Sequence, residues 1–118
     1  SLGGWKLQGR TNEKAKQILD DAHKVQQAGA FSLVLEMIPA SLSTQITKEL
    51  NIPTIGIGAG PETSGQVLVL QDILGMNNNF NPTFLRKYMD SFSLIKNCLN
   101  QFNQDVKKGD FPNEKESF

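Results

Sequence analysis

The sequence has a single cysteine, Cys98, and a single histidine, His23. One cysteine cannot form a disulfide within the chain, and it excludes a zinc site built from several cysteines of this chain. A lone thiol fits a reducing compartment, so we expect a cytoplasmic protein. Cys98 lies in a helical pattern of apolar residues, which predicts a small core residue. His23 is expected at a surface or boundary, and no Ser-His-Asp or Cys-His set can be assembled.

Long apolar runs and an excess of charge of one sign are also missing. No run approaches the ~20 apolar residues that a membrane-spanning helix needs. Twelve basic residues balance twelve acidic ones, so neither nucleic acid nor a membrane surface is an expected partner. The first residues have no initiator Met and no signal-peptide core, which predicts a fragment or a processed chain.

Two amphipathic helices are predicted in the first half of the chain. Asn12 is the expected N-cap of the first helix, and Gly29 is expected to end it in a left-handed turn. Ser41 or Ser43 is expected to cap a second helix that ends near Leu50. The residues expected to face inward from this second helix are Leu42, Ile46 and Leu50.

Three short apolar runs, residues 31–35, 54–58 and 67–70, predict strands. Their composition is typical of a parallel sheet covered on both faces. Helices between such strands form βαβ units, so the fold class is α/β. Three parallel strands cannot close a barrel, which takes about eight. We therefore expect one portion of a larger α/β fold.

The last third of the chain is predicted to be helical. Asn81 as N-cap and Pro82 in the first turn mark a helix start. Apolar residues over 85–106 recur in steps of three and four, which indicates a seam for packing against another element or another subunit. Poor helix formers near 91–93 leave open a break into two helices. Gly109 is expected to end the helical region, and the tail beyond it has little helical or strand signal.

Ligand chemistry in α/β proteins gathers at the carboxyl ends of parallel strands. Glu36 stands there, directly after the apolar run FSLVL of residues 31–35. A partly desolvated carboxylate is a suitable general acid or base near neutral pH. A glutamate turned to solvent, or paired with a lysine, is an equal alternative from position alone.

The other two predicted strand ends carry weaker signals. The glycines of residues 56–60 do not form a dinucleotide fingerprint, because Pro61 stands where the third glycine belongs. They can contact a ligand or permit a tight turn and close packing, and both readings stay open. Asp72 is expected to cap the turn at residues 74–75 rather than to act as a second acid.

Four stretches of the sequence resemble one known family, the ketopantoate hydroxymethyltransferases. They are GGWKLQGR (3–10), LVLEMIPASLSTQIT (33–47), IPTIGIGAGPETSGQVLVLQDILGM (52–76) and GDFPNEKESF (109–118). The resemblance runs from end to end of the chain. It implies that residues 1–118 are a single segment, the C-terminal half of a (β/α)₈ TIM barrel, with about three βα units followed by helices.

The resemblance also implies an activity. Enzymes of this family transfer a hydroxymethyl group from 5,10-methylenetetrahydrofolate to 3-methyl-2-oxobutanoate, which gives 2-dehydropantoate for pantothenate biosynthesis. It implies that Glu36 is the catalytic general base and that Mg²⁺ chelates the 2-oxo acid substrate. Nothing in residues 1–118 matches the family's metal-ligand motifs, so we expect no metal ligand here and no activity of this chain alone. The family forms homo-oligomers, ring-like decamers, for which residues 85–106 are an expected contact surface.

The sequence departs from the family at two positions. Gln71 and Glu116 stand where the family often has histidine, so any role of those histidines is in doubt here. Two alternatives to the transferase remain: a half-barrel with a structural role only, and a metal-dependent barrel lyase acting on another 2-oxo acid. No residue is assigned to cofactor binding.

Overall fold

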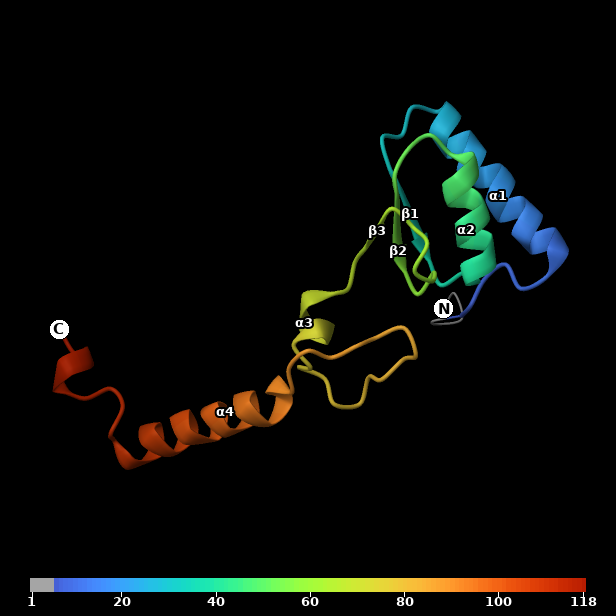
Figure 1. Cartoon of the computed structure of the whole chain (residues 1–118). Coiled ribbons are helices and arrows are strands. Elements are labelled where there is room, and N and C mark those ends of the chain that lie inside the picture. Colours follow the sequence, from blue (N-terminus) through green and yellow to red (C-terminus); the bar gives the residue numbers. More distant parts are fainter. Residues whose placement is uncertain (1–5) are drawn as a thin grey trace. The chain divides into compact units, whose positions relative to one another are not determined.

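The computed structural model describes residues 6–118, which fall into two compact units, residues 6–68 and Val69–Phe118 (Figure 1). Residues 6–10 have no regular secondary structure. No helix in the described part of the chain has the length and apolar character to cross a membrane.

The first unit is a parallel sheet with two helices on one side of it. Strands β1 (Leu33–Glu36), β2 (Thr54–Ile57) and β3 (Gly65–Gln66) lie in that order, and both pairings are parallel. Helices α1 (Asn12–Gln27) and α2 (Ala40–Glu49) cover the same face (Figure 1). The predicted α/β class is confirmed. Coverage of both faces was wrong for residues 6–68, whose second sheet face is open.

The core of this unit forms between the covered face of the sheet and the two helices. Ile46 is fully buried, and Leu42 and Leu50 lie with it, which confirms the three inward positions predicted for α2. β1 contributes Leu35, from its covered face, to the buried cluster. The buried cluster consists of Ala22, Leu35, Ile38, Leu42, Ile46, Leu50 and Ala59.

The structure corrects both predicted helix starts. Thr11, rather than Asn12, is the N-cap of α1, and its hydroxyl accepts a hydrogen bond from the first turn. Helix α2 begins directly after Pro39, so Ser41 and Ser43 both lie inside the helix instead of capping it. The end of α1 is as predicted, because Gly29 follows it with a left-handed φ of 96°.

The third strand is shorter than predicted and lies earlier in the chain. Gly65 and Gln66 pair with Ile55 and Gly56, while residues 67–69 have no regular structure. Helix α3 (Leu70–Ile73) follows at once. The strand predicted at 67–70 was therefore wrong beyond its first residue: the Val67 N–H still donates to the Gly56 oxygen of β2 at 3.0 Å, but helix α3 already begins at Leu70.

The longest element of the second unit is helix α4 (Ser91–Lys108), which starts nine residues after the predicted Pro82. Residues 82–90 are not helical. Their backbone bonds elsewhere instead: the Tyr88 N–H donates to the Ile73 oxygen at 2.8 Å, and the Ser91 N–H donates to the Leu74 oxygen at 3.1 Å. The sequence left open whether a break near 91–93 divides this stretch into two helices. The structure has a single helix, which begins at Ser91.

Gly109 ends α4 in a left-handed conformation, as predicted. The tail beyond it, expected to have little structure, forms a short 3₁₀ helix, η1 (Glu114–Glu116). Asn113 caps this turn, because its side chain accepts the Lys115 N–H at 2.8 Å. The Glu116 carboxylate accepts the Asn113 N–H in return, which completes a capping box.

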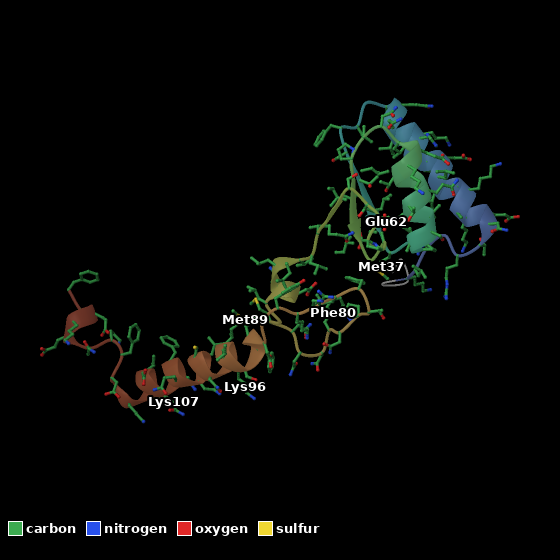
Figure 2. The ribbon with its side chains drawn as sticks, viewed as in Figure 1. Met37, Glu62, Phe80, Met89, Lys96 and Lys107 are labelled. Atoms are coloured by element: carbon green, nitrogen blue, oxygen red, sulfur yellow. The ribbon has the colours of Figure 1, made fainter. Side chains whose placement is uncertain are left out.

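Cys98 is exposed on α4, so its predicted core position was wrong. The seam around it is largely exposed as well, and Figure 2 shows the side chains along α4. Within the second unit the Phe111 ring packs on the seam, edge-on to Phe102 with 5.5 Å between the ring centroids. The exposed apolar residues of this helix are Leu94, Ile95, Leu99, Phe102 and Val106.

His23 links the two helices of the first unit. Its Nε2 lies 2.8 Å from Oε2 of Glu49, and Gln45 donates to the other oxygen of that carboxylate at 2.9 Å. These hydrogen bonds, the one with His23 first, hold the pKa of Glu49 below its ordinary value of 4.5. His23 is half-buried, which agrees with the boundary position predicted for it.

Replacing Ile46 by alanine is expected to destabilise the intact protein by about 2–5 kcal/mol, because the change leaves a cavity in the core. Urea denaturation measures the difference in free energy of unfolding. The matched control is Lys48→Ala, an exposed position of the same helix, where we expect a change below about 0.5 kcal/mol. Equal effects of the two changes would show that the α2 core is not formed in this way.

The Glu49→Gln variant is expected to melt at a lower temperature than the parent protein at pH 7. The lowered pKa means that the folded state favours ionised Glu49, so this contribution to stability is present above pH 4.5. It is lost as the pH falls through the lowered pKa. The difference in melting temperature should therefore shrink on acidification, and a difference that stays constant from pH 7 to pH 3 would contradict the linkage.

Candidate active site

The carboxyl ends of β1 and β2 meet at one edge of the sheet. Glu36, the last residue of β1, is the register partner of Ile57, the last residue of β2. The glycine-rich loop 58–60 follows directly. Two of the three predicted strand ends are therefore brought together by the parallel pairing.

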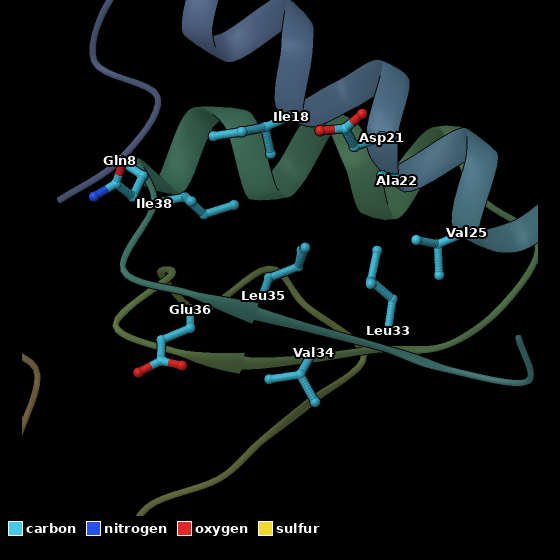
Figure 3. A pocket seen from close by; sticks show the side chains of 10 residues that line it. All are labelled: Gln8, Ile18, Asp21, Ala22, Val25, Leu33, Val34, Leu35, Glu36 and Ile38. Atoms are coloured by element: carbon cyan, nitrogen blue, oxygen red, sulfur yellow. The ribbon is translucent and has the colours of Figure 1, made fainter. Parts of the chain in front are cut away.

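Glu36 points away from the two helices. Side chains alternate along a strand, so Leu33 and Leu35 face the helices while Val34 and Glu36 face the open side (Figure 3). Val34 is 57% exposed, and the Glu36 side chain is exposed as well. The carboxylate has no hydrogen bond or ion pair to any described residue.

The surroundings of Glu36 correct the expectation of partial desolvation, and they favour exposure to solvent over pairing with a lysine. Partial desolvation was predicted, but the carboxylate is open to solvent, because no residue of 6–68 covers this face of the sheet. Pairing with a lysine is likewise not seen. The predicted candidate thus has a free carboxylate at the carboxyl edge of a parallel sheet, where it can accept a proton from a bound molecule.

A groove of about 360 Å³ runs along the edge of β1 beneath α1 (Figure 3). It is lined by side chains from both faces of β1, because β1 is the edge strand of the sheet and pairs only with β2 among the described strands. Its lining is mainly apolar. The residues are Gln8, Ile18, Asp21, Ala22, Val25, Leu33, Val34, Leu35, Glu36 and Ile38.

The glycine-rich loop beside Glu36 packs closely against the start of α2. A Cβ on Gly60 would lie 2.4 Å from the Cβ of Ala40, and the φ of Gly60 is +79°. The Ser43 hydroxyl donates to the Ala59 oxygen, and the Gln66 amide donates to the Gly60 oxygen at 2.8 Å. Of the two readings of these glycines, close packing is the one that the contacts support.

Asp72 does not stand at a strand end. It lies in helix α3 of the second unit, as does Gln71. The predicted cap by its side chain is not seen, because the Gly75 N–H donates to the backbone oxygen of Asp72 at 3.1 Å. Its carboxylate has no hydrogen bond within the described part of the chain.

Residues 6–118 contain no group of three or more His, Cys, Asp or Glu side chains that could hold a metal ion. By themselves these residues therefore do not fit a magnesium site, which needs several oxygen ligands.

One feature of the site had no clear signal in the sequence. Met37, directly after Glu36, has a left-handed backbone with a φ of 53°. Glycine and asparagine are the residues that usually mark such a position, so a methionine gave no warning. The available hint was the spacing of the apolar residues Leu35 and Ile38, which are both buried. They are three positions apart, whereas residues on one face of a regular strand are separated by even numbers of positions.

A family model described as ketopantoate hydroxymethyltransferase matches residues 1–114. The chain belongs to the ketopantoate hydroxymethyltransferase family. The resemblance of the four sequence stretches is thereby confirmed. The match extends over both compact units, up to two residues before the C-terminal end of η1.

Curated relatives agree with this family. The chain is 56% identical to the 3-methyl-2-oxobutanoate hydroxymethyltransferase of Bdellovibrio bacteriovorus over 99% of its residues. It is 50% identical to the enzyme of that name from Geobacter metallireducens over 99%, and 49% identical to the one from Francisella tularensis over its full length. The chain spans 44% to 45% of the length of these relatives.

The Gly60→Ala variant is expected to be less stable than the Gly29→Ala variant. Both glycines have a positive φ, which costs an alanine about 1–2 kcal/mol. At Gly60 the new methyl group would also collide with Ala40, whereas nothing lies within 4 Å of it at Gly29. Urea denaturation of the two variants measures the added cost, and equal losses would contradict the close packing of the loop.

Proposed function

We propose that this chain supplies the general base of a ketopantoate hydroxymethyltransferase, and that the base is Glu36. The carboxylate takes the proton from C3 of 3-methyl-2-oxobutanoate. The enolate carbon then bonds to the methylene carbon of 5,10-methylenetetrahydrofolate, water supplies the hydroxyl group, tetrahydrofolate leaves, and the product is 2-dehydropantoate. The observation that carries the proposal is the position of Glu36 at the carboxyl edge of a parallel sheet, with no bonding partner among residues 6–118, in a chain of this family.

We also propose that residues 1–118 form one segment, the C-terminal half, of a (β/α)₈ TIM barrel. Three successive parallel strands with both helices on one face support this arrangement. In a barrel the helices lie outside and the other face turns inward, which would surround Glu36 by further strands. The groove along the edge of β1 would then hold the preceding strand.

Mg²⁺ is the metal that the family resemblance implies. Because the described residues offer no ligand group, we propose that its ligands lie on residues of the enzyme outside 6–118. The remaining proposals are a small-molecule 2-oxo acid as substrate, a cytoplasmic location and a homo-oligomer. The exposed apolar residues of α4 are compatible with a subunit contact.

The test is the Glu36→Gln variant of the intact protein that contains this chain. Glutamine has the size of glutamate but cannot take the proton, so exchange of the C3 deuterium of 3-methyl-2-oxobutanoate should slow by about 10²–10⁴-fold. The exchange is followed by NMR without folate, which isolates proton removal from the transfer.

Glu13→Gln, an exposed change in the first turn of α1, is the matched control and should keep the exchange rate. The melting temperatures of both variants should equal that of the parent. If Glu36→Gln exchanges deuterium at the parental rate, Glu36 is not the base, and a structural role of this segment becomes the better account.

A further inference from the structure

We propose that Met37 is a positioning residue for Glu36, acting through its left-handed backbone rather than through its side chain. The inference rests on the proposed role of Glu36 as general base. Among the described residues, Met37 is the only residue other than glycine with a positive φ. Such a conformation is unfavourable for a residue with a Cβ, so it persists only where the surroundings impose it.

Met37 is the point at which the chain changes faces of the sheet. Continued alternation along β1 would place Ile38 on the open side with Val34 and Glu36. Ile38 is instead only 5% exposed and packs in the core with Leu35 (Figure 3). The left-handed turn at Met37 thus lets an exposed acid and a buried anchor stand two residues apart on opposite faces.

Both backbone polar groups of Met37 are bound. Its N–H donates to the Ile57 oxygen of β2 at 3.0 Å, and its oxygen accepts the Gln8 N–H at 2.7 Å. The segment that supplies Gln8 is itself tightly packed, since a Cβ on Gly9 would lie 2.8 Å from the Leu42 side chain. Contacts from two separate segments therefore hold the unfavourable conformation in place.

This arrangement sets the direction of Glu36. If Met37 returned to an extended conformation, either Ile38 would leave the core or Glu36 would rotate toward the helices. Burial of Ile38 disfavours the first outcome. A relaxed Met37 would thus turn the carboxylate away from the open side of the sheet, where the proposed chemistry takes place.

The test compares residues that differ in their tolerance of a positive φ. Met37→Asn and Met37→Gly remove the apolar side chain but suit a left-handed backbone. Met37→Ile keeps an apolar side chain of similar size, but its branched Cβ strongly disfavours that backbone. The intact enzyme is assayed for C3-deuterium exchange of 3-methyl-2-oxobutanoate, with kcat and KM determined separately and the melting temperature recorded for each variant.

We expect the Asn and Gly variants to keep kcat within about threefold of the parent. The Ile variant should lose about 10- to 100-fold in kcat with a smaller change in KM, because a misdirected base slows the chemical step. A role of the methionine side chain instead requires both the Asn and Gly variants to lose activity, whether or not the Ile variant folds. Loss in Asn and Gly, or a fully active Ile variant, overturns the proposal.

The Glu36→Gln variant in the same assay separates this inference from the proposed function. If it keeps exchange, Glu36 is not the base, and the assignment of Met37 falls with it. If Glu36→Gln loses exchange while Met37→Ile keeps it, Glu36 remains the base and only the positioning role of Met37 is overturned.

Discussion

The parallel pairing of β1 with β2 is the constraint on which the rest of the first unit depends. It runs in register from Leu33 and Thr54 to Glu36 and Ile57. Because both strands point the same way, their carboxyl ends share one edge, and the acid and the glycine-rich loop meet there without any direct bond between them. A shift of one residue would turn Glu36 toward the helices, so burial of Leu35 protects the site as well as the core.

The candidate site lies on a sheet whose one face is packed against helices and whose other face is open. On the covered face, α2 is held to the strands by buried polar contacts as well as by apolar ones. The fully buried Thr54 hydroxyl of β2 lies 2.7 Å from the Thr47 hydroxyl of α2. The opposite face of the sheet and the unpaired edge of β1 have no covering residues within 6–68. A chain that spans under half the length of its relatives and leaves these surfaces open is what the proposed barrel requires.

Sequence patterns predicted the elements wherever local preference and tertiary packing agree. The spacing in and just after α2 identified the buried apolar residues Leu42, Ile46 and Leu50, and the apolar runs located β1 and β2. The predictions at 67–70 and 82–90 were wrong because backbone partners elsewhere decide those segments. The pairing with β2 begins at Gly65 and ends with the Val67 N–H, and the backbone after Pro82 bonds to the end of α3. An apolar run in the sequence does not show which backbone groups the segment will bond to.

The sequence by itself determined the family and the identity of the candidate base, because the motif around Glu36 is carried by residue types in order along the chain. The tertiary structure alone decided which way that base points. Methionine has no preference for a left-handed backbone, and nothing local predicts one at Met37. The conformation arises from bonds to Ile57 and Gln8 and from burial of Ile38, which are contacts that exist only once the sheet and helices have come together.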